Sequence, residues 1–214
     1  MTTSPPTRRA DPAPNHHAAY PAFAGIGGLV AALTFTVGRG AVADLAIRLT
    51  DVGPDDDIVD VGCGPGVAVR SAAATGASSV TGVDPAPVML RVARTLNRRR
   101  RHAPPVRYLD GAAEHLPLPD GSVSVLWSLA TVHHWRDLTA GLHEATRVLR
   151  PSGRLLAIER RVAPGTSGHA VHGWTEGQAR RFAEACQAAG FTNIDIGHHR
   201  PNHKPVVAVL ATKR

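Results

Sequence analysis

The residues with the clearest chemical potential surround a glycine-rich turn, Gly62–Gly66, which follows a short apolar segment. An acid, Asp60, precedes the turn, and a second acid, Asp84, ends the next apolar segment, Ser79–Val83. Glycines leave the backbone open to close approach by a ligand. A carboxylate at the end of a neighbouring strand can accept hydrogen bonds from both hydroxyls of a ribose. The pattern therefore predicts a nucleoside-like ligand on the turn, with its sugar at Asp84.

The spacing of the glycines does not fit two common phosphate-binding motifs. A P-loop ends in Gly-Lys-Ser or Gly-Lys-Thr, whereas Gly66 is followed by Val67 and Ala68. The glycines read Gly-x-Gly-x-Gly rather than the Gly-x-Gly-x-x-Gly of dinucleotide-binding turns. Because the carboxylate of Asp60 repels a pyrophosphate, the turn favours a cationic ligand.

The string Asp60-Val-Gly-Cys-Gly-Pro-Gly66 resembles the first motif of class I S-adenosylmethionine-dependent methyltransferases, and Asp84 stands where that family keeps its ribose-binding acid. The resemblance extends from about residue 41 to 161 and implies S-adenosylmethionine as the cofactor. Arg39 is either a partner of the methionyl carboxylate or a solvated surface residue. The predicted cofactor-binding residues are Arg39, Asp60, Gly62, Cys63, Gly64, Asp84, Pro85, Ala112, Ala113, Ser128 and Leu129.

The segment Gly111–Ser122 resembles the adenine-side segment of the branch that includes ubiquinone and menaquinone methyltransferases. Ala112 occupies the position where that branch usually has Asp, so the carboxylate that accepts from the adenine amino group is absent unless Asp110 or Glu114 substitutes. Ser124 replaces an acid that the family usually has near the start of the next strand. The resemblance also implies that Ser128 and Leu129, at the end of that strand, contact the methionyl end of the cofactor.

His133, His134 and Trp135 follow this strand and resemble a His-His-Trp string of the same branch. Imidazole titrates near neutral pH, so either histidine is a candidate catalytic base, and the alternative for each is a structural role. A metal site is not expected, because neighbouring side chains on regular structure point apart and no zinc-type spacing with cysteines occurs.

These residues need strands that end at one edge of a sheet. Apolar β-branched runs alternate with Ala- and Leu-rich helical runs, which predicts an α/β fold. We expect a doubly wound, Rossmann-like, seven-stranded, mostly parallel sheet with helices on both faces, and the resemblance implies an antiparallel edge strand. The expected strands are 58–61, 79–83, 106–109, 123–129, 154–159, 192–197 and 206–211. The expected helices are 41–49, 67–74, 85–96, 136–149 and 175–189.

The predicted organisation is a disordered tail at 1–15, an N-terminal helical cap at 16–40 and a methyltransferase domain at 41–214. In the cap, Tyr20, Phe23 and Phe35 are candidate walls of the acceptor site or plain core residues. The loop Val162–Trp174, rich in Gly, Pro and His, is a candidate lid.

The composition is that of a globular protein. The 214 residues are 43% apolar and 19% charged, with a net charge of +7 that we expect to be spread over the surface rather than to form a nucleic-acid site. Two cysteines do not make a disulfide framework, which favours a cytoplasmic location. Glycines and a proline interrupt the uncharged run at 18–37, so neither export nor a membrane span is expected.

We therefore predict a methyltransferase that moves a methyl group from S-adenosylmethionine to a small, apolar acceptor by in-line displacement. One alternative is a nucleic-acid methyltransferase, although the Asn- or Asp-Pro-Pro-Tyr motif of amino-methylating enzymes is missing after the fourth strand. Another is a non-catalytic module that binds the cofactor. The identity of the acceptor and a homodimeric state are left open.

Overall fold

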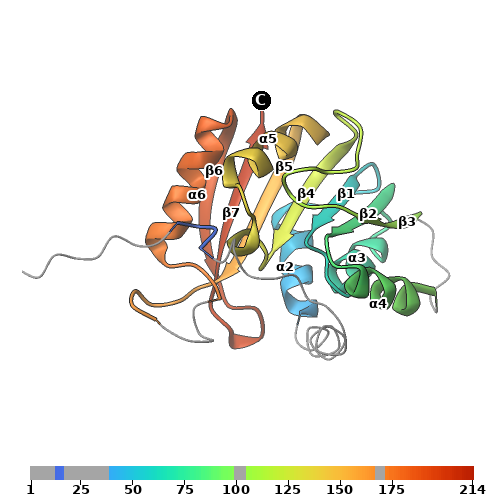
Figure 1. Cartoon of the computed structure of the whole chain (residues 1–214), viewed down its shortest axis with the longest axis horizontal. Helices are drawn as coiled ribbons and strands as arrows, with labels where there is room; N and C mark the ends of the chain where they lie inside the picture. The colour runs from blue at the N-terminus through green and yellow to red at the C-terminus, as the bar shows by residue number, and fades with distance from the viewer. Residues whose placement is uncertain (1–12, 17–38, 99–104, 167–171) are drawn as a thin grey trace, which may run out of the picture.

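A computed structural model describes residues 13–16, 39–98, 105–166 and 172–214 (Figure 1). The predicted tail up to residue 12, most of the predicted cap, and Tyr20, Phe23 and Phe35 lie outside the described residues. No helix in the described part of the chain is long and apolar enough to cross a membrane.

Seven strands form one sheet in the order β3-β2-β1-β4-β5-β7-β6. The strands are β1 (Asp57–Val61), β2 (Ser79–Asp84), β3 (Val106–Asp110), β4 (Val123–Leu129), β5 (Leu149–Arg160), β6 (Phe191–His199) and β7 (Val206–Lys213). All neighbouring pairs are parallel except those of β7, which runs antiparallel to both β5 and β6. This confirms the predicted doubly wound α/β sheet.

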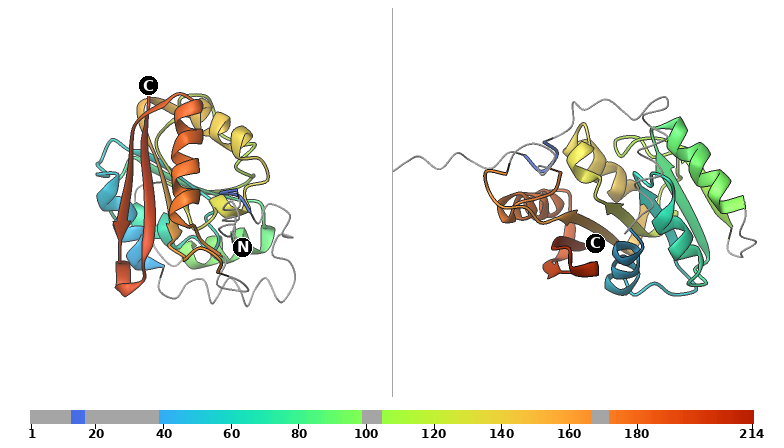
Figure 2. Two further views of the ribbon diagram at one scale, coloured as in Figure 1. Left: turned by 90° about the vertical axis from the view of Figure 1, so that its left-hand side faces the viewer. Right: turned by 90° about the horizontal axis from the view of Figure 1, so that it is seen from below.

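Helices cover both faces of the sheet, as the left view of Figure 2 shows for α2 on one side and α5 and α6 on the other. The helices are α2 (Gly40–Leu49), α3 (Val67–Ala73), α4 (Pro87–Arg98), α5 (Leu138–Val148) and α6 (Glu176–Ala188). Apolar side chains of α2, α3 and α4 share one core cluster, and those of α5 and α6 share the other. Both clusters also contain residues of the sheet, so the chain is a three-layer α/β domain.

Helix ends follow from local sequence. Thr175 caps α6 by accepting the N–H of Gln178, while the Gln178 side chain accepts the N–H of Thr175. This capping box satisfies two backbone donors that the first turn leaves unpaired. Gly190, with φ of +93°, ends the helix, as its sequence position predicts. Helix α4 begins at Pro87 rather than at the predicted Pro85, because Asp84 and Ala86 are engaged in a turn.

The strand order places a switch point between β1 and β4, since β2 follows β1 on one side and β5 follows β4 on the other. In open α/β sheets the crevice outside the carboxyl ends of such strands is where ligands bind. The glycine turn leaves β1 at this point, and Ala130 leaves β4 beside it.

Candidate active site

The glycine turn is held against the end of β2 by its own backbone. The N–H groups of Gly62 and Cys63 both donate to the carbonyl of Val83, at 2.8 and 3.1 Å. At Gly62 φ is +77°, and an added Cβ would lie 2.6 Å from Cγ2 of Thr131. At Gly64 φ is +52°, and an added Cβ would meet nothing within 4 Å. Gly62 therefore serves packing, whereas Gly64 exposes bare backbone to open space.

Asp84 joins the turn to the second strand. Its two carboxylate oxygens accept the N–H groups of Gly64, at 2.8 Å, and of Ala86, at 2.9 Å. Burial raises the pKa of this carboxyl, while both hydrogen bonds and the charge of Arg39 oppose the rise. Each carboxylate oxygen accepts more than one hydrogen bond, so Asp84 can hold the turn and still receive a ribose hydroxyl.

A cavity at the switch point brings together five of the predicted cofactor residues. Its walls are formed by Arg39, Val42, Asp60, Gly62, Cys63, Pro65, Val67, Ala68, Leu129 and Ala130. Arg39 thus lies at the wall of this cavity, and its role toward the cofactor stays a prediction.

The charges around this cavity are predominantly negative. Burial raises the pKa of Asp60 to about 7, an effect that Arg39 opposes and Asp84 reinforces. Burial lowers the pKa of Arg39, and the charges of Asp60, Glu159 and Asp84 counteract it. One guanidinium therefore faces three acids, so the site is suited to a ligand that carries positive charge.

Cys63 contributes backbone rather than thiol chemistry. Burial raises the pKa of the Cys63 thiol well above its usual range. The Sγ atom packs against Gly82, where an added Cβ would lie only 2.7 Å from the sulfur. The side chain points under the turn, toward β2. Cys186, the other cysteine, is also free and buried in the core.

The segment after β3 has one carboxylate available at the expected adenine side. Asp110 is exposed at the end of β3 and is in register with Asp84. Glu114 instead accepts the N–H groups of Arg136, at 2.6 Å, and Asp137, which holds the start of α5. Of the two predicted substitutes for an acid at Ala112, the geometry favours Asp110. Nearby, Ala113 is buried in the core and Pro85 is exposed.

Two serines of β4 make hydrogen bonds within the protein. The Ser128 hydroxyl lies 2.6 Å from that of Thr131, which donates to the carbonyl of Val61 and so ties β4 to β1. Ser124 donates to Asp56 at the opposite end of the strand, the edge away from the glycine turn. The replacement of an acid by Ser124 therefore does not bear on the cofactor cavity.

His133 is held by an acid that sequence reasoning did not single out. Its Nδ1 lies 2.9 and 3.0 Å from the two carboxylate oxygens of Glu159, and both residues are buried. A carboxylate only accepts hydrogen bonds, so the proton of a neutral His133 sits on Nδ1 and the lone pair on Nε2. Glu159 is the penultimate residue of β5, and Asp84 is the last residue of β2. An acid near the end of a buried strand was the signal that the sequence offered for Glu159.

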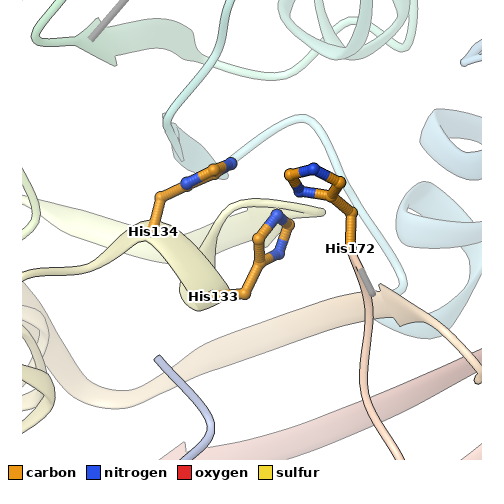
Figure 3. Close-up of side chains that lie close together, drawn as sticks. All are labelled: His133, His134 and His172. Carbon is orange, nitrogen blue, oxygen red and sulfur yellow. The ribbon is translucent and has the colours of Figure 1, made fainter. Parts of the chain in front are cut away.

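His134 and His172 lie beside His133, as Figure 3 shows. The ring centroids of His133 and His134 are 4.2 Å apart, and those of His133 and His172 are 5.5 Å apart. The expectation that neighbouring histidine side chains point apart fails here, because His133 and His134 occupy a 3-10 turn, Val132–His134, rather than regular helix or strand. His172 comes from the predicted lid loop and was not singled out from the sequence.

A short N-terminal segment, Ala13–His16, packs against this region. Its carbonyl at Pro14 accepts the indole N–H of Trp174, at 2.9 Å. The side chain of Asn15 donates to the carbonyl of Trp135, and the ring of His16 stacks 6.0 Å from that of His133. Residues 13–15 were expected in a disordered tail, whereas here they make specific hydrogen bonds with segments more than 100 residues away.

The structure is a doubly wound domain with an open glycine turn and a cavity at its switch point. Residues 59–157 match the family model described as "Methyltransferase domain". The matched span contains the glycine turn and Asp84, the two features that carry the resemblance to class I S-adenosylmethionine-dependent methyltransferases.

Among curated proteins, the chain is similar to malonyl-[acyl-carrier protein] O-methyltransferase of Serratia marcescens, with 34% identity over 66% of this chain and 53% of that protein. It is 36% identical to demethylmenaquinone methyltransferase of Tropheryma whipplei, over 53% of this chain and 46% of that protein. The chain thus spans about half the length of these relatives. A solved methyltransferase from Aquifex aeolicus shares the fold, with a TM-score of 0.70, 18% identity, and coverage of 87% of this chain and 98% of that one.

Proposed function

We propose that the chain transfers a methyl group from S-adenosylmethionine to a small-molecule acceptor. The observation that carries the proposal is the site at the glycine turn, where open backbone at Gly64 adjoins Asp84 and a cluster of buried acids. Both curated relatives described above are named as methyltransferases, one of a quinone precursor and one of a carrier-bound malonyl group.

The residues present fit this cofactor. The space beside Gly64, which a Cβ would fill, accommodates close approach of a nucleoside, and Asp84 accepts its ribose hydroxyls. Asp60 offers a carboxylate to the ammonium group, and Arg39 offers a guanidinium to the carboxylate of the methionyl end. Asp110 is the proposed acceptor for the adenine amino group. The negative charge of the site favours S-adenosylmethionine, whose sulfur is cationic, over its demethylated product, whose sulfur is neutral.

The bound cofactor supplies an activated methyl group, so the chain's own task is to position the acceptor and manage its proton. Alignment of the reacting atoms is worth roughly 7–11 kcal/mol of barrier lowering. Leu129 and Ala130 place the 3-10 turn of His133 and His134 next to the cofactor cavity. The Nε2 lone pair of His133, set by Glu159, is a suitable proton acceptor for an acidic hydroxyl or carbon acid.

The same residues support proposals on acceptor class and location. The buried indole rings of Trp135 and Trp174 next to the histidines favour an acceptor with apolar surface. The two buried, free thiols of Cys63 and Cys186 are compatible with the reducing cytoplasm. Cell fractionation with an antibody to the chain tests this location, and recovery outside the cytoplasmic fraction would contradict it.

Ligand-dependent melting tests the cofactor assignment. S-adenosylhomocysteine at 100 times its dissociation constant stabilises a binding protein by about 2.7 kcal/mol, which raises the melting temperature of a chain of this size by about 5–10 °C. Asp84→Ala is expected to abolish the rise, while Asp195→Ala on the distant strand β6 is the matched control that keeps it. Absence of a rise in the unsubstituted chain would refute the cofactor assignment.

A further inference from the structure

Three imidazoles converge above the carboxyl edge of β4 and β5. Each of His133, His134 and His172 has one ring nitrogen in a group of three atoms that lie within 4.8 Å of one another (Figure 3). His133 is buried, and the other two are half-buried. We propose that these three histidines bind one divalent transition-metal ion.

The separation of the nitrogens is close to what a metal requires. Zinc–nitrogen bonds of about 2.1 Å at the tetrahedral angle place two ligand nitrogens about 3.4 Å apart. The three rings therefore need to close by about 1.4 Å at most, a movement that small rotations about their side-chain torsions supply. Three imidazole nitrogens suit zinc, copper, nickel or iron, whereas magnesium and calcium prefer oxygen ligands.

Glu159 gives the cluster the outer support typical of metal-binding histidines. Metal-bound imidazoles usually donate their second ring N–H to a carboxylate or carbonyl, which fixes the ring and raises its basicity. Both oxygens of Glu159 lie within 3.0 Å of His133 Nδ1, and the backbone N–H of His133 points at the same carboxylate. This leaves Nε2 of His133 as the atom directed at the metal.

His172 is fixed by the backbone around it. Its carbonyl accepts Nε of Arg160 at 3.0 Å, and the N–H of Trp174 donates to the carbonyl of Arg160 at 2.8 Å. Gly173 allows this approach, since an added Cβ there would lie 2.2 Å from the Arg160 carbonyl oxygen. The three ligands therefore come from two segments that β5 anchors independently, rather than from one flexible loop.

Three protein ligands leave a fourth position, the arrangement of catalytic rather than structural zinc. The site adjoins the cofactor cavity, because Ala130 lines that cavity and begins the segment that leads to His133. If the proposed methyl transfer holds, an acceptor oxygen bound to the metal there would lose its proton more readily. The imidazoles would then be ligands instead of bases, because their lone pairs would bind the metal.

Metal binding is tested directly on the purified chain after dialysis against a chelator. Zn²⁺ titrated calorimetrically should bind at one ion per chain, and Co²⁺ should give the intense visible absorption of a tetrahedral site, while Mg²⁺ should give neither. His134→Ala and His172→Ala should each abolish the Co²⁺ spectrum, and Glu159→Gln should weaken Zn²⁺ binding about 10–100-fold. His198, an exposed histidine that pairs with Glu176 and is not part of the three-histidine cluster, provides the matched control, and His198→Ala should change nothing.

The rise in melting temperature with S-adenosylhomocysteine shows separately whether each variant is folded and whether the cofactor assignment holds. Loss of the Co²⁺ spectrum in His172→Ala with an intact melting rise supports the metal site. The proposal is overturned if the unsubstituted chain binds no Zn²⁺, or if His172→Ala keeps both stoichiometry and spectrum, since surface histidines would then hold the ion. Zn²⁺ binding without any melting rise would refute the cofactor assignment alone.

Discussion

The buried acid Asp60 should lower the stability of the ligand-free protein while it strengthens cofactor binding. Burial raises its pKa from 3.8 to about 7, so between these values the folded chain holds a proton that the unfolded chain has released. Stability contributed by such a group falls as pH rises, and the loss is complete above the folded pKa. Asp60→Asn removes the titration with little change in shape, and it should therefore be more stable than the unsubstituted chain at alkaline pH.

The size of the effect follows from the two pKa values. With 1.36 kcal/mol per unit, the penalty of ionising Asp60 reaches about 4 kcal/mol at pH 8 and about 1.7 kcal/mol at pH 5. The stability advantage of Asp60→Asn should thus grow by about 2.5 kcal/mol between pH 5 and pH 8. For a chain of this length that difference corresponds to about 5–10 °C in melting temperature.

Urea unfolding of both proteins at a series of pH values measures how the difference in their free energies of unfolding changes with pH. Groups that the substitution leaves unchanged titrate alike in both proteins, so their contributions drop out of this difference. Asp57→Asn is the matched control, because Asp57 is a partly exposed acid at the other end of the same strand. A constant difference between Asp60→Asn and the unsubstituted chain from pH 5 to pH 8 would refute the argument that burial raises the Asp60 pKa.

Cofactor binding should respond in the opposite direction. An ionised Asp60 attracts the ammonium group, so the affinity of the unsubstituted chain for S-adenosylmethionine should rise as pH increases from 6 to 8. Asp60→Asn should bind more weakly at pH 8, with a flatter pH dependence over this range. Calorimetric titration at each pH measures both trends, and equal affinity of the two proteins at pH 8 would remove Asp60 from the cofactor site.

Three further substitutions or treatments test the turn. Gly62→Ala should lower the free energy of unfolding in urea by about 1–3 kcal/mol, because φ at Gly62 is +77° and the new Cβ would clash with Thr131. A loss below about 0.5 kcal/mol, the usual effect of a surface substitution, would contradict that packing. Gly64→Ala should lower the free energy of unfolding by about 1–2 kcal/mol, because φ at Gly64 is +52°. It should also weaken S-adenosylmethionine binding about tenfold or more, and an unchanged dissociation constant would mean that the ligand does not approach this backbone. A thiol reagent should modify Cys63 and Cys186 slowly in the native chain and both rapidly in denaturant, and fast native labelling of either thiol would contradict its burial.

The sequence by itself determined the sheet, the turn and the cofactor class. Gly62–Gly66 between two apolar strands, with Asp84 at the end of the second strand, is a local pattern, and parallel strands bring their carboxyl ends to one edge whatever the details of packing. Capping at Thr175 and helix termination at Gly190 are local in the same way, since each depends on backbone groups within one turn.

Only the tertiary structure decided which distant side chains meet. Glu159 and His133 are 26 residues apart, and the contact between them arises from the end of β5 lying beside the turn after β4. His172 joins them through backbone hydrogen bonds of a loop whose sequence shows no periodicity, and Ala13–His16 docks on Trp174 across 160 residues. Arg39 fits two roles in the sequence, and its place at the cavity beside Asp60 is a property of the packed chain. The position of Ser124 at the opposite edge of the sheet, bonded to Asp56, is likewise set by the packed chain.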